Sequence, residues 1–242
     1  EIGNINKDKT VMEIGPGYGN LTKAIISKTP KKFFAVEKDK KLSSVLEKKF
    51  KNYKNLKIIN RDILDIIEEK NLEQNMVVFG NLPYNISTKI LASLIMLKKW
   101  PPWYDVLILM FQKEVADRIL AKPCTKEYGR LSILSNWRLE IKKHFDVSKN
   151  SFFPKPKVDS TILSFRPKKN NFLNLQNPKN LEKITQLLFS NRRKMINKNL
   201  KKLFKKKPFL LKNLNIDLNK RPGELSNEIF YKIAVEYEKL FD

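Results

Sequence analysis

The sequence is short of the residue types on which several classes of function depend. It has one cysteine, Cys124, and one histidine, His144, among 242 residues. A single cysteine excludes an internal disulfide and favours a reducing compartment, and one His with one Cys cannot form a typical zinc site. The longest apolar run, at 106–111, has the length of a buried strand and falls far short of the roughly 20 residues that span a membrane. We therefore expect a cytoplasmic protein with no metal centre and no membrane span.

Acidic residues are also scarce. The chain has 25 Asp and Glu against 49 Lys and Arg, a formal net charge of +24. Such an excess indicates a polyanionic partner, either nucleic acid or an anionic membrane surface. Nearly all of this charge is lysine, which an AT-rich genome would also produce without selection for binding. Residues 166–242 carry 19 Lys and Arg against 7 Asp and Glu, so the last third is the more basic part.

The first two-thirds of the chain alternate between short apolar strands and helical segments. We expect strands at 11–14, 33–36, 56–59, 76–79 and 105–111, with helices between them, one of them capped by Ser87. Strands that are apolar on both faces and separated by helices predict a parallel sheet covered on both sides. Three later segments, 131–137, 141–147 and 160–165, are expected to be antiparallel edge strands.

The pattern changes after residue 169. Residues 170–180 are rich in Asn and read as a linker, and apolar residues then recur at helical spacing. We therefore predict an α/β domain over 1–169 and a small helical, basic domain over 170–242. The Lys-rich run at 198–207 is expected to contact RNA.

Candidate binding residues follow the first strand in the stretch EIGPGYGNLT (13–22). Gly15, Gly17 and Gly19 lie between a strand and a helix, where glycine lets the backbone turn tightly and approach a ligand closely. Their G-x-G-x-G spacing differs from the dinucleotide fingerprint G-x-G-x-x-G. Alone, such a turn can be purely structural.

Polar residues follow the next two strands at the same edge of the predicted sheet. Glu37 closes the second strand, where a carboxylate can accept hydrogen bonds from both ribose hydroxyls of an adenosine. Asp62 follows the third strand and could accept from an adenine amino group. The glycine turn, Glu37 and Asp62 in this order favour a nucleoside-containing cofactor.

The stretch GNLPYNIST (80–88) follows the fourth strand. The side-chain oxygen of Asn81 and the carbonyl of Leu82 could both accept from an exocyclic amine. Pro83 stiffens the turn, and Tyr84 offers a flat face for stacking a base. Two acceptors on an aromatic amine would favour a pyramidal nitrogen with its lone pair exposed for attack.

These stretches resemble the successive motifs of class I S-adenosylmethionine-dependent methyltransferases, and Asn-Leu-Pro-Tyr is the variant seen in rRNA adenine N6-dimethyltransferases. Four further stretches are similar to the KsgA-type small-subunit rRNA dimethylases: FQKEVADRI (111–119), YGRLSI (128–133), FFPKPKVDS (152–160) and NRRKMINKNL (191–200). The resemblance covers nearly the whole chain. It implies a Rossmann-like, mostly parallel sheet with antiparallel edge strands, followed by a small all-α, RNA-binding domain.

The resemblance also assigns roles to residues. Those that would contact S-adenosylmethionine are Gly15, Gly17, Glu37, Lys38, Asp62, Ile63 and Asn81. Those that would position the target adenine are Asn81, Leu82, Pro83, Tyr84 and Phe152. Phe152 occupies the aromatic position of the F-x-P-x-P pattern and would stack on the flipped base, with Phe153 as the alternative.

The implied reaction is dimethylation of N6 on two adjacent adenines in a hairpin loop near the 3′ end of 16S rRNA. It would be carried out by a monomer on the small ribosomal subunit precursor during subunit biogenesis. Family members usually carry a basic segment with a Gln-Asn-Phe-Leu-like sequence ahead of the first strand. That segment is absent here, so we expect this chain to be N-terminally short.

Three other functions fit part of the sequence. An Erm-type methylase, which modifies large-subunit rRNA and confers macrolide resistance, shares the central motifs. A non-catalytic ribosome assembly factor could keep the same fold, although the intact Gly15, Glu37, Asp62 and Asn81 argue against it. A nicotinamide dehydrogenase would require a hydride-transfer site that the sequence does not offer.

Overall fold

The computed structural model describes residues 2–69, 71–169 and 175–241, which form two compact units. The first unit comprises Glu1–Ala116 and Glu140–Pro167, and the second comprises Asp117–Leu139 and Lys168–Asp242. The chain therefore leaves the first unit, contributes to the second, and returns. No helix in the described part of the chain is long and apolar enough to cross a membrane.

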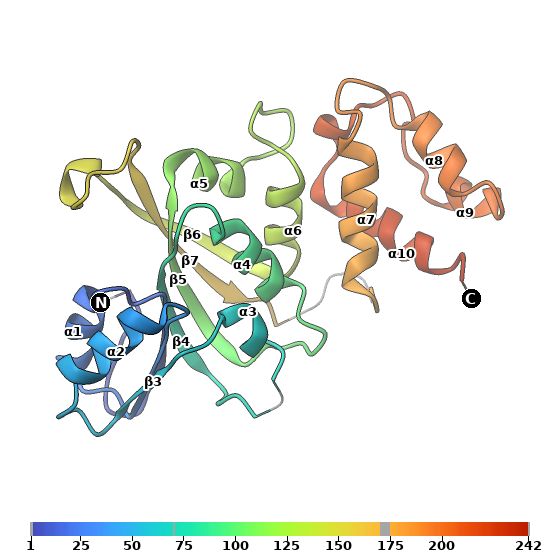
Figure 1. Cartoon of the computed structure of the whole chain (residues 1–242). Coiled ribbons are helices and arrows are strands. Elements are labelled where there is room, and N and C mark those ends of the chain that lie inside the picture. Colours follow the sequence, from blue (N-terminus) through green and yellow to red (C-terminus); the bar gives the residue numbers. More distant parts are fainter. Residues whose placement is uncertain (1, 70, 170–174, 242) are drawn as a thin grey trace. The chain divides into compact units, whose positions relative to one another are not determined.

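The first unit is a strand-and-helix structure in which helices follow the parallel strands (Figure 1). Its strands are β1 (Thr10–Ile14), β2 (Lys32–Val36), β3 (Leu56–Ile59), β4 (Met76–Asn81), β5 (Tyr104–Gln112), β6 (Leu139–Val147) and β7 (Ser160–Pro167). Its helices are α1 (Asn20–Ile26), α2 (Lys40–Lys49), α3 (Ile63–Ile66), α4 (Ser87–Ile95), the first half of α5 (Lys113–Leu120) and the 3₁₀ turn η1 (Lys149–Ser151).

The seven strands form one sheet in the order β3-β2-β1-β4-β5-β7-β6. Pairing is parallel from β3 through β5, and β7 runs antiparallel to β5. This confirms the predicted α/β fold with a mostly parallel sheet and antiparallel strands toward one edge. The order of the strands reverses at β1 and β4, which are adjacent, and such a switch point is where α/β sheets bind ligands.

Apolar residues on successive strands explain why the sheet forms. Val11, Phe33 and Val77 are buried side by side in register on β1, β2 and β4. Ile25 of α1 packs on this cluster, together with Val106 of β5. Burying each such side chain stabilises the fold by about 1.5–3 kcal/mol. This core fixes the carboxyl ends of β1 and β4 beside each other.

The second unit is helical. Its elements are the second half of α5, α6 (Arg130–Arg138), α7 (Pro178–Phe189), α8 (Asn197–Leu203), α9 (Pro208–Asn213), the 3₁₀ turn η2 (Pro222–Glu224) and α10 (Asn227–Glu238). Helices α6, α7 and α10 pack on one another, and α7 and α10 are drawn in orange and red in Figure 1. The Phe189 and Phe230 rings stack with centroids 5.7 Å apart.

Hydrogen bonds tie the early segment of this unit to its last helix. The Tyr128 hydroxyl donates to the Leu225 carbonyl at 3.0 Å, and the Tyr231 hydroxyl donates to the Ile133 carbonyl at 3.1 Å. Burial raises the pKa of both phenols, so both stay protonated donors. The predicted division after residue 169 did not foresee that Asp117–Leu139 packs with the C-terminal helices.

The prediction of an extended segment at 131–137 was wrong, because these residues form helix α6. Its residues are buried nearly all round, including Ser132, Ile133, Ser135 and Trp137. A short helix buried on all sides shows neither helical nor alternating periodicity. The other two late segments are strands β6 and β7, as expected.

Three smaller differences concern the ends of elements. Ser87 is the first residue of α4 and not its N-cap, which is Ile86, and the Ser87 hydroxyl donates to the Tyr84 carbonyl at 3.2 Å. Strand β4 continues through Gly80 to Asn81, two residues past its predicted end. Part of the predicted linker, 170–174, lies outside the described residues.

Candidate active site

An open cleft of about 510 Å³ lies at the carboxyl ends of β1, β2 and β4, within the first unit. Eight of the predicted site residues line it: Gly15, Gly17, Glu37, Asn81, Leu82, Pro83, Tyr84 and Phe152. The volume falls within the range of roughly 300–1,000 Å³ that is typical of small-molecule sites. Three predicted residues, Lys38, Asp62 and Ile63, do not line it.

The three glycines of the turn after β1 have different tasks. All three have positive backbone φ angles, which residues with a Cβ atom rarely adopt. Gly15 and Gly17 line the cleft, and a Cβ on Gly17 would meet no atom within 4 Å. A Cβ on Gly19 would lie 2.6 Å from the Phe50 ring of the segment after α2. Gly15 and Gly17 therefore expose backbone to the cleft, while Gly19 allows α1 and α2 to pack.

Glu37 is held in place by backbone donors on both of its oxygens. Its Oε2 accepts from the Gly17 amide at 3.1 Å, and its Oε1 accepts from the Asp39 amide at 2.9 Å. The side-chain amide of Asn60 donates to the Glu37 carbonyl at 2.9 Å. Because an ionised carboxylate has about four lone-pair sites, Glu37 keeps acceptor capacity toward the cleft.

A second carboxyl group, Glu13, also lines the cleft, and sequence reasoning did not single it out. It is 1% exposed, and its Oε2 accepts from the Thr22 hydroxyl at 2.6 Å. Burial raises the pKa of Glu13 to about 7, which the Thr22 hydrogen bond partly opposes and the nearby Glu37 charge reinforces. The sequence signal that could have identified Glu13 is an acidic residue one position before the end of an otherwise apolar strand.

Both carboxylate oxygens of Asp62 accept hydrogen bonds from residues of the chain. Its Oδ1 accepts from the Leu64 amide at 2.9 Å and caps α3, and its Oδ2 accepts from Lys38 Nζ at 2.9 Å. The backbone hydrogen bond from Leu64 and the Lys38 partner lower the pKa of Asp62. Ile63 is buried as the first residue of α3. These residues lie after β3, the edge strand, beyond the lining of the cleft.

The stretch after β4 supplies another part of the cleft lining. Asn81 ends the strand and is exposed, whereas Leu82 is 2% exposed and anchors the turn. The Pro83 carbonyl accepts from the amides of Ile86 and Ser87, both at 3.1 Å, which closes the turn into α4. This arrangement leaves the Asn81 amide at the surface of the cleft.

Tyr84 is fixed by a residue far along the chain. Its hydroxyl is 2.9 Å from the Ser160 hydroxyl at the start of β7. Ser160 is fully buried and Tyr84 is half-buried, so this hydrogen bond is partly shielded from water. Sequence reasoning did not identify Ser160, because a serine at the start of a strand carries no signal of a partner 76 residues away.

The two candidate aromatic residues, Phe152 and Phe153, lie in the segment before β7 and differ in their exposure. Phe152, Pro154 and Pro156 line the cleft, and Phe152 is half-buried. Phe153 is 103% exposed and does not line the cleft. Of the two rings, Phe152 is therefore the one at the cleft.

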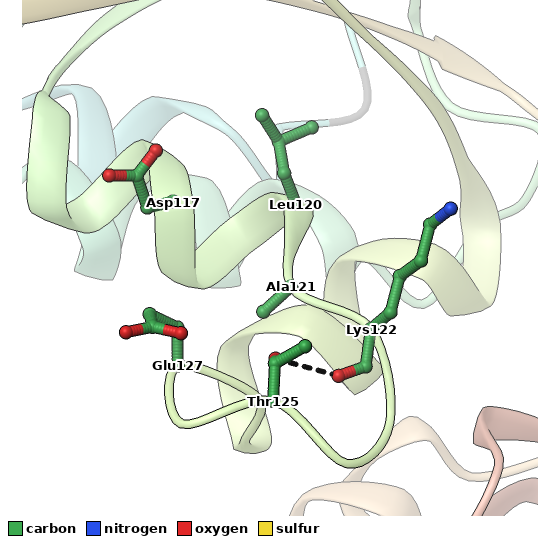
Figure 2. A pocket seen from close by; sticks show the side chains of 6 residues that line it. All are labelled: Asp117, Leu120, Ala121, Lys122, Thr125 and Glu127. Atoms are coloured by element: carbon green, nitrogen blue, oxygen red, sulfur yellow. Dashed lines mark hydrogen bonds between the residues drawn. The ribbon is translucent and has the colours of Figure 1, made fainter.

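A second hollow, of about 470 Å³, lies in the second unit (Figure 2). It is lined by Asp117, Leu120, Ala121, Lys122, Thr125 and Glu127. Figure 2 shows the two carboxylates on one side and Lys122 on the other, with the Thr125 hydroxyl donating to the Lys122 carbonyl at 2.8 Å. No group of three or more His, Cys, Asp or Glu able to hold a metal occurs among the described residues.

The chain is similar to known proteins over nearly its whole length. The model of the family described as ribosomal RNA adenine dimethylase matches residues 2–239. A ribosomal RNA small subunit methyltransferase A of Pelagibacter ubique is 50% identical over 233 residues, which cover 96% of this chain and 88% of that protein.

Two solved structures are also similar. A dimethyladenosine transferase from Plasmodium falciparum has a TM-score of 0.78 at 29% identity, covering 98% of this chain and 92% of that one. The 23S rRNA methyltransferase ErmE has a TM-score of 0.67 at 21% identity, covering 98% and 94%, and this likeness concerns the fold alone. The sheet is thus of the Rossmann-like class I methyltransferase type. The match of the family model over residues 2–239 and the 50% identity to the Pelagibacter ubique protein show that the chain belongs to the ribosomal RNA adenine dimethylase family.

Proposed function

We propose that this protein transfers methyl groups from S-adenosylmethionine to N6 of adenine in small-subunit rRNA, twice on each of two adjacent adenines. The observation that carries the proposal is the cleft itself. It is lined by the glycine turn and Glu37 together with Asn81–Tyr84 and Phe152. A nucleoside cofactor and a nucleobase would thus meet in one cavity.

The residues around the glycine turn fit a cationic nucleoside cofactor. Glu13 and Glu37 both line the cleft, and their carboxyl groups would favour the positive charges of S-adenosylmethionine. Glu37 would accept the ribose hydroxyls, and the exposed backbone of Gly15 and Gly17 would contact the methionine part. When bound, the cofactor supplies an electrophilic methyl group on a sulfonium centre. Asp62 would reach the adenine amino group only in competition with Lys38.

The residues after β4 fit an adenine amino group. The Asn81 side-chain oxygen and the Leu82 carbonyl would accept its two N–H groups, which favours a pyramidal nitrogen with its lone pair directed away from them. Tyr84 and Phe152 would hold the ring by stacking. No strong general acid is required, because the departing thioether is neutral. Positioning and electrostatics therefore supply most of the acceleration.

RNA binding would draw on the basic surface. Extracting the target base from its stack costs a few kcal/mol, which contacts between lysines and phosphates would offset. Lys198, Lys201 and Lys202, in or beside α8, are exposed and suit this role. Lys207, at the end of the same run, donates instead to the Lys239 carbonyl at 2.7 Å and supports the end of α10. We expect affinity to fall steeply with salt.

The substrate is proposed to be 16S rRNA within a small-subunit precursor, and the enzyme is proposed to be a cytoplasmic monomer. The small-subunit relatives support this choice over an Erm-type activity on the large subunit.

Purified unmethylated small and large subunits, incubated separately with labelled cofactor, test the proposal. We expect label on the small subunit, and mass mapping should place two methyl groups on each of two adjacent adenines. Label on the large subunit alone would support the Erm-type alternative. Binding of S-adenosylhomocysteine without any transfer would support the non-catalytic alternative.

A further inference from the structure

The segment between η1 and β7 has two different edges. Its inner edge consists of Phe152, Pro154 and Pro156, all of which line the cleft. Its outer edge consists of the alternate residues Phe153, Lys155 and Lys157, all of which are exposed and outside the cleft lining. We refer to Phe153, Lys155 and Lys157 as the outer edge.

Phe153 is unusual for an exposed residue. At 103% relative exposure its ring makes almost no contact within the chain, although burying a phenylalanine ordinarily stabilises a fold. Folding therefore gains nothing from an aromatic residue at this position. Its neighbour Phe152 lines the cleft, so the exposed ring stands one residue outside the proposed base site.

The surrounding charges favour a nucleic acid over a protein surface. Residues 147–158 contain three lysines and no acidic residue. The next acidic residue, Asp159, is engaged, since its Oδ1 accepts from the Lys149 amide at 2.9 Å. An exposed aromatic ring beside exposed lysines is the composition of surfaces that bind single-stranded nucleic acid, where bases stack on rings and lysines hold phosphates.

We propose that the outer edge binds the single-stranded RNA that flanks the target adenine, with Phe153 stacking on the base next to it and Lys155 and Lys157 holding its phosphates. This rests on the proposed function, because it takes Phe152 to face the target base. Two rings on consecutive residues would then receive two consecutive bases, one inside the cleft and one at its rim. The outer edge would bind RNA without touching the reacting atoms.

Methylation kinetics on unmethylated small subunits test this inference. Loss of one base–aromatic stack typically weakens binding by about tenfold. We expect Phe153→Ala and Phe153→Leu to raise KM for the subunit about tenfold and to leave kcat within twofold. Phe153→Trp, which keeps a stacking face, should stay within twofold of the wild-type KM.

A matched control is Val158→Ala, which truncates another exposed apolar residue of the same segment, 42% exposed. We expect its KM to be unchanged. Wild-type KM in Phe153→Ala would overturn the inference, as would a Phe153→Leu variant as good as Phe153→Trp, because apolar contact and not stacking would then suffice. Thermal melting should show all four variants folded, since neither position is buried.

Replacing Phe153 with a photoreactive phenylalanine analogue gives a second measurement that does not depend on turnover. We expect a cross-link to the nucleotide adjacent to a target adenine, mapped by primer extension. A cross-link to a ribosomal protein or to a distant rRNA site would overturn the inference. If the wild-type enzyme does not label small subunits, the proposed function fails and this inference with it. If the wild type labels them and only the variants behave contrary to expectation, this inference alone fails.

Discussion

On the β1 and β2 side of the cleft, hydrogen bonds from Gly17 and Asp39 join the Glu37 carboxylate to the backbone. On the β4 side, the Asn81 amide is exposed and has no hydrogen-bond partner among the described residues. The ring of Tyr84 is secured there through Ser160, a distant residue. One side is therefore organised locally, and the other presents an exposed side-chain amide, which the proposed function assigns to the substrate amine.

This difference bears on how the two sides should respond to mutation. Contacts within the first side support one another, so changes there should alter cofactor affinity and stability. The second side holds few groups that matter to the fold, so changes there should alter turnover with little effect on folding. Four variants test this difference between the two sides, and they are given from the largest expected effect to the smallest.

Asn81→Ala should give the largest effect, because it removes a proposed acceptor for the reacting amine. We expect kcat to fall roughly 100-fold or more, by analogy with the loss of one preorganised hydrogen-bonding group in other active sites. Single-turnover methylation of small subunits measures this. Asn85→Ala, an exposed neighbour in the same loop, is the matched control and should keep full activity. Normal turnover by Asn81→Ala would remove the proposed mechanism.

Glu13→Gln should change how stability depends on pH. The pKa of Glu13 is about 7 in the folded chain against an ordinary value of 4.5, so the folded state holds its proton more tightly. This tighter proton binding stabilises the folded state by about 3 kcal/mol at most. The stabilisation is fully present below about pH 4.5 and is lost as the pH rises through 7. Urea unfolding from pH 5 to 8 measures it. We expect the variant to lack this decline, and a decline identical to that of the wild type would contradict the assignment.

Glu37→Gln should weaken cofactor binding. The amide has a single oxygen and no charge, so it cannot accept from both backbone amides and two ribose hydroxyls at once. We expect the Kd for S-adenosylhomocysteine to rise about tenfold by isothermal titration, since each charged hydrogen bond contributes about 1.5–3 kcal/mol. Glu47→Gln, exposed on α2, should bind normally. An unchanged Kd in Glu37→Gln would mean that the ribose is held elsewhere.

Ser160→Ala should give the smallest effect, because it removes only the support of Tyr84. One neutral hydrogen bond is worth about 1 kcal/mol, so we expect kcat/KM to fall about fivefold. Tyr84→Phe should cost a similar amount, and the double variant should cost no more than either single one. Additive losses would show that the two hydroxyls act independently.

Sequence patterns predicted the parts of the fold and site that are local. The five parallel strands are apolar and separated by helices. Gly15, Glu37 and Asn81, which the sequence places at strand ends, line one cleft, and their roles stay predictions. Asp62 also follows a strand end, but its strand, β3, lies at the edge of the sheet. The Asp62 carboxylate pairs with Lys38. Strand order is a long-range property, which no spacing within one segment reports.

The parts that were missed depend on contacts between distant segments. Helix α6 is buried on every side and carries no periodic signal. The Tyr84–Ser160 pair joins residues 76 positions apart. The choice between Phe152 and Phe153 also needed coordinates, because both are equally aromatic and only the path of the backbone determines which one lines the cleft.

The path of the chain through the two units has a practical consequence for protein engineering. Because Asp117–Leu139 belongs with the C-terminal helices, a deletion at residue 169 would strip Tyr128, Ile133 and Trp137 of the packing that buries them. The product would be an aggregation-prone remnant and not a minimal catalytic module. Chimeras that exchange the second unit between related enzymes therefore need two crossover points, near 116 and 140, as well as the one near 168.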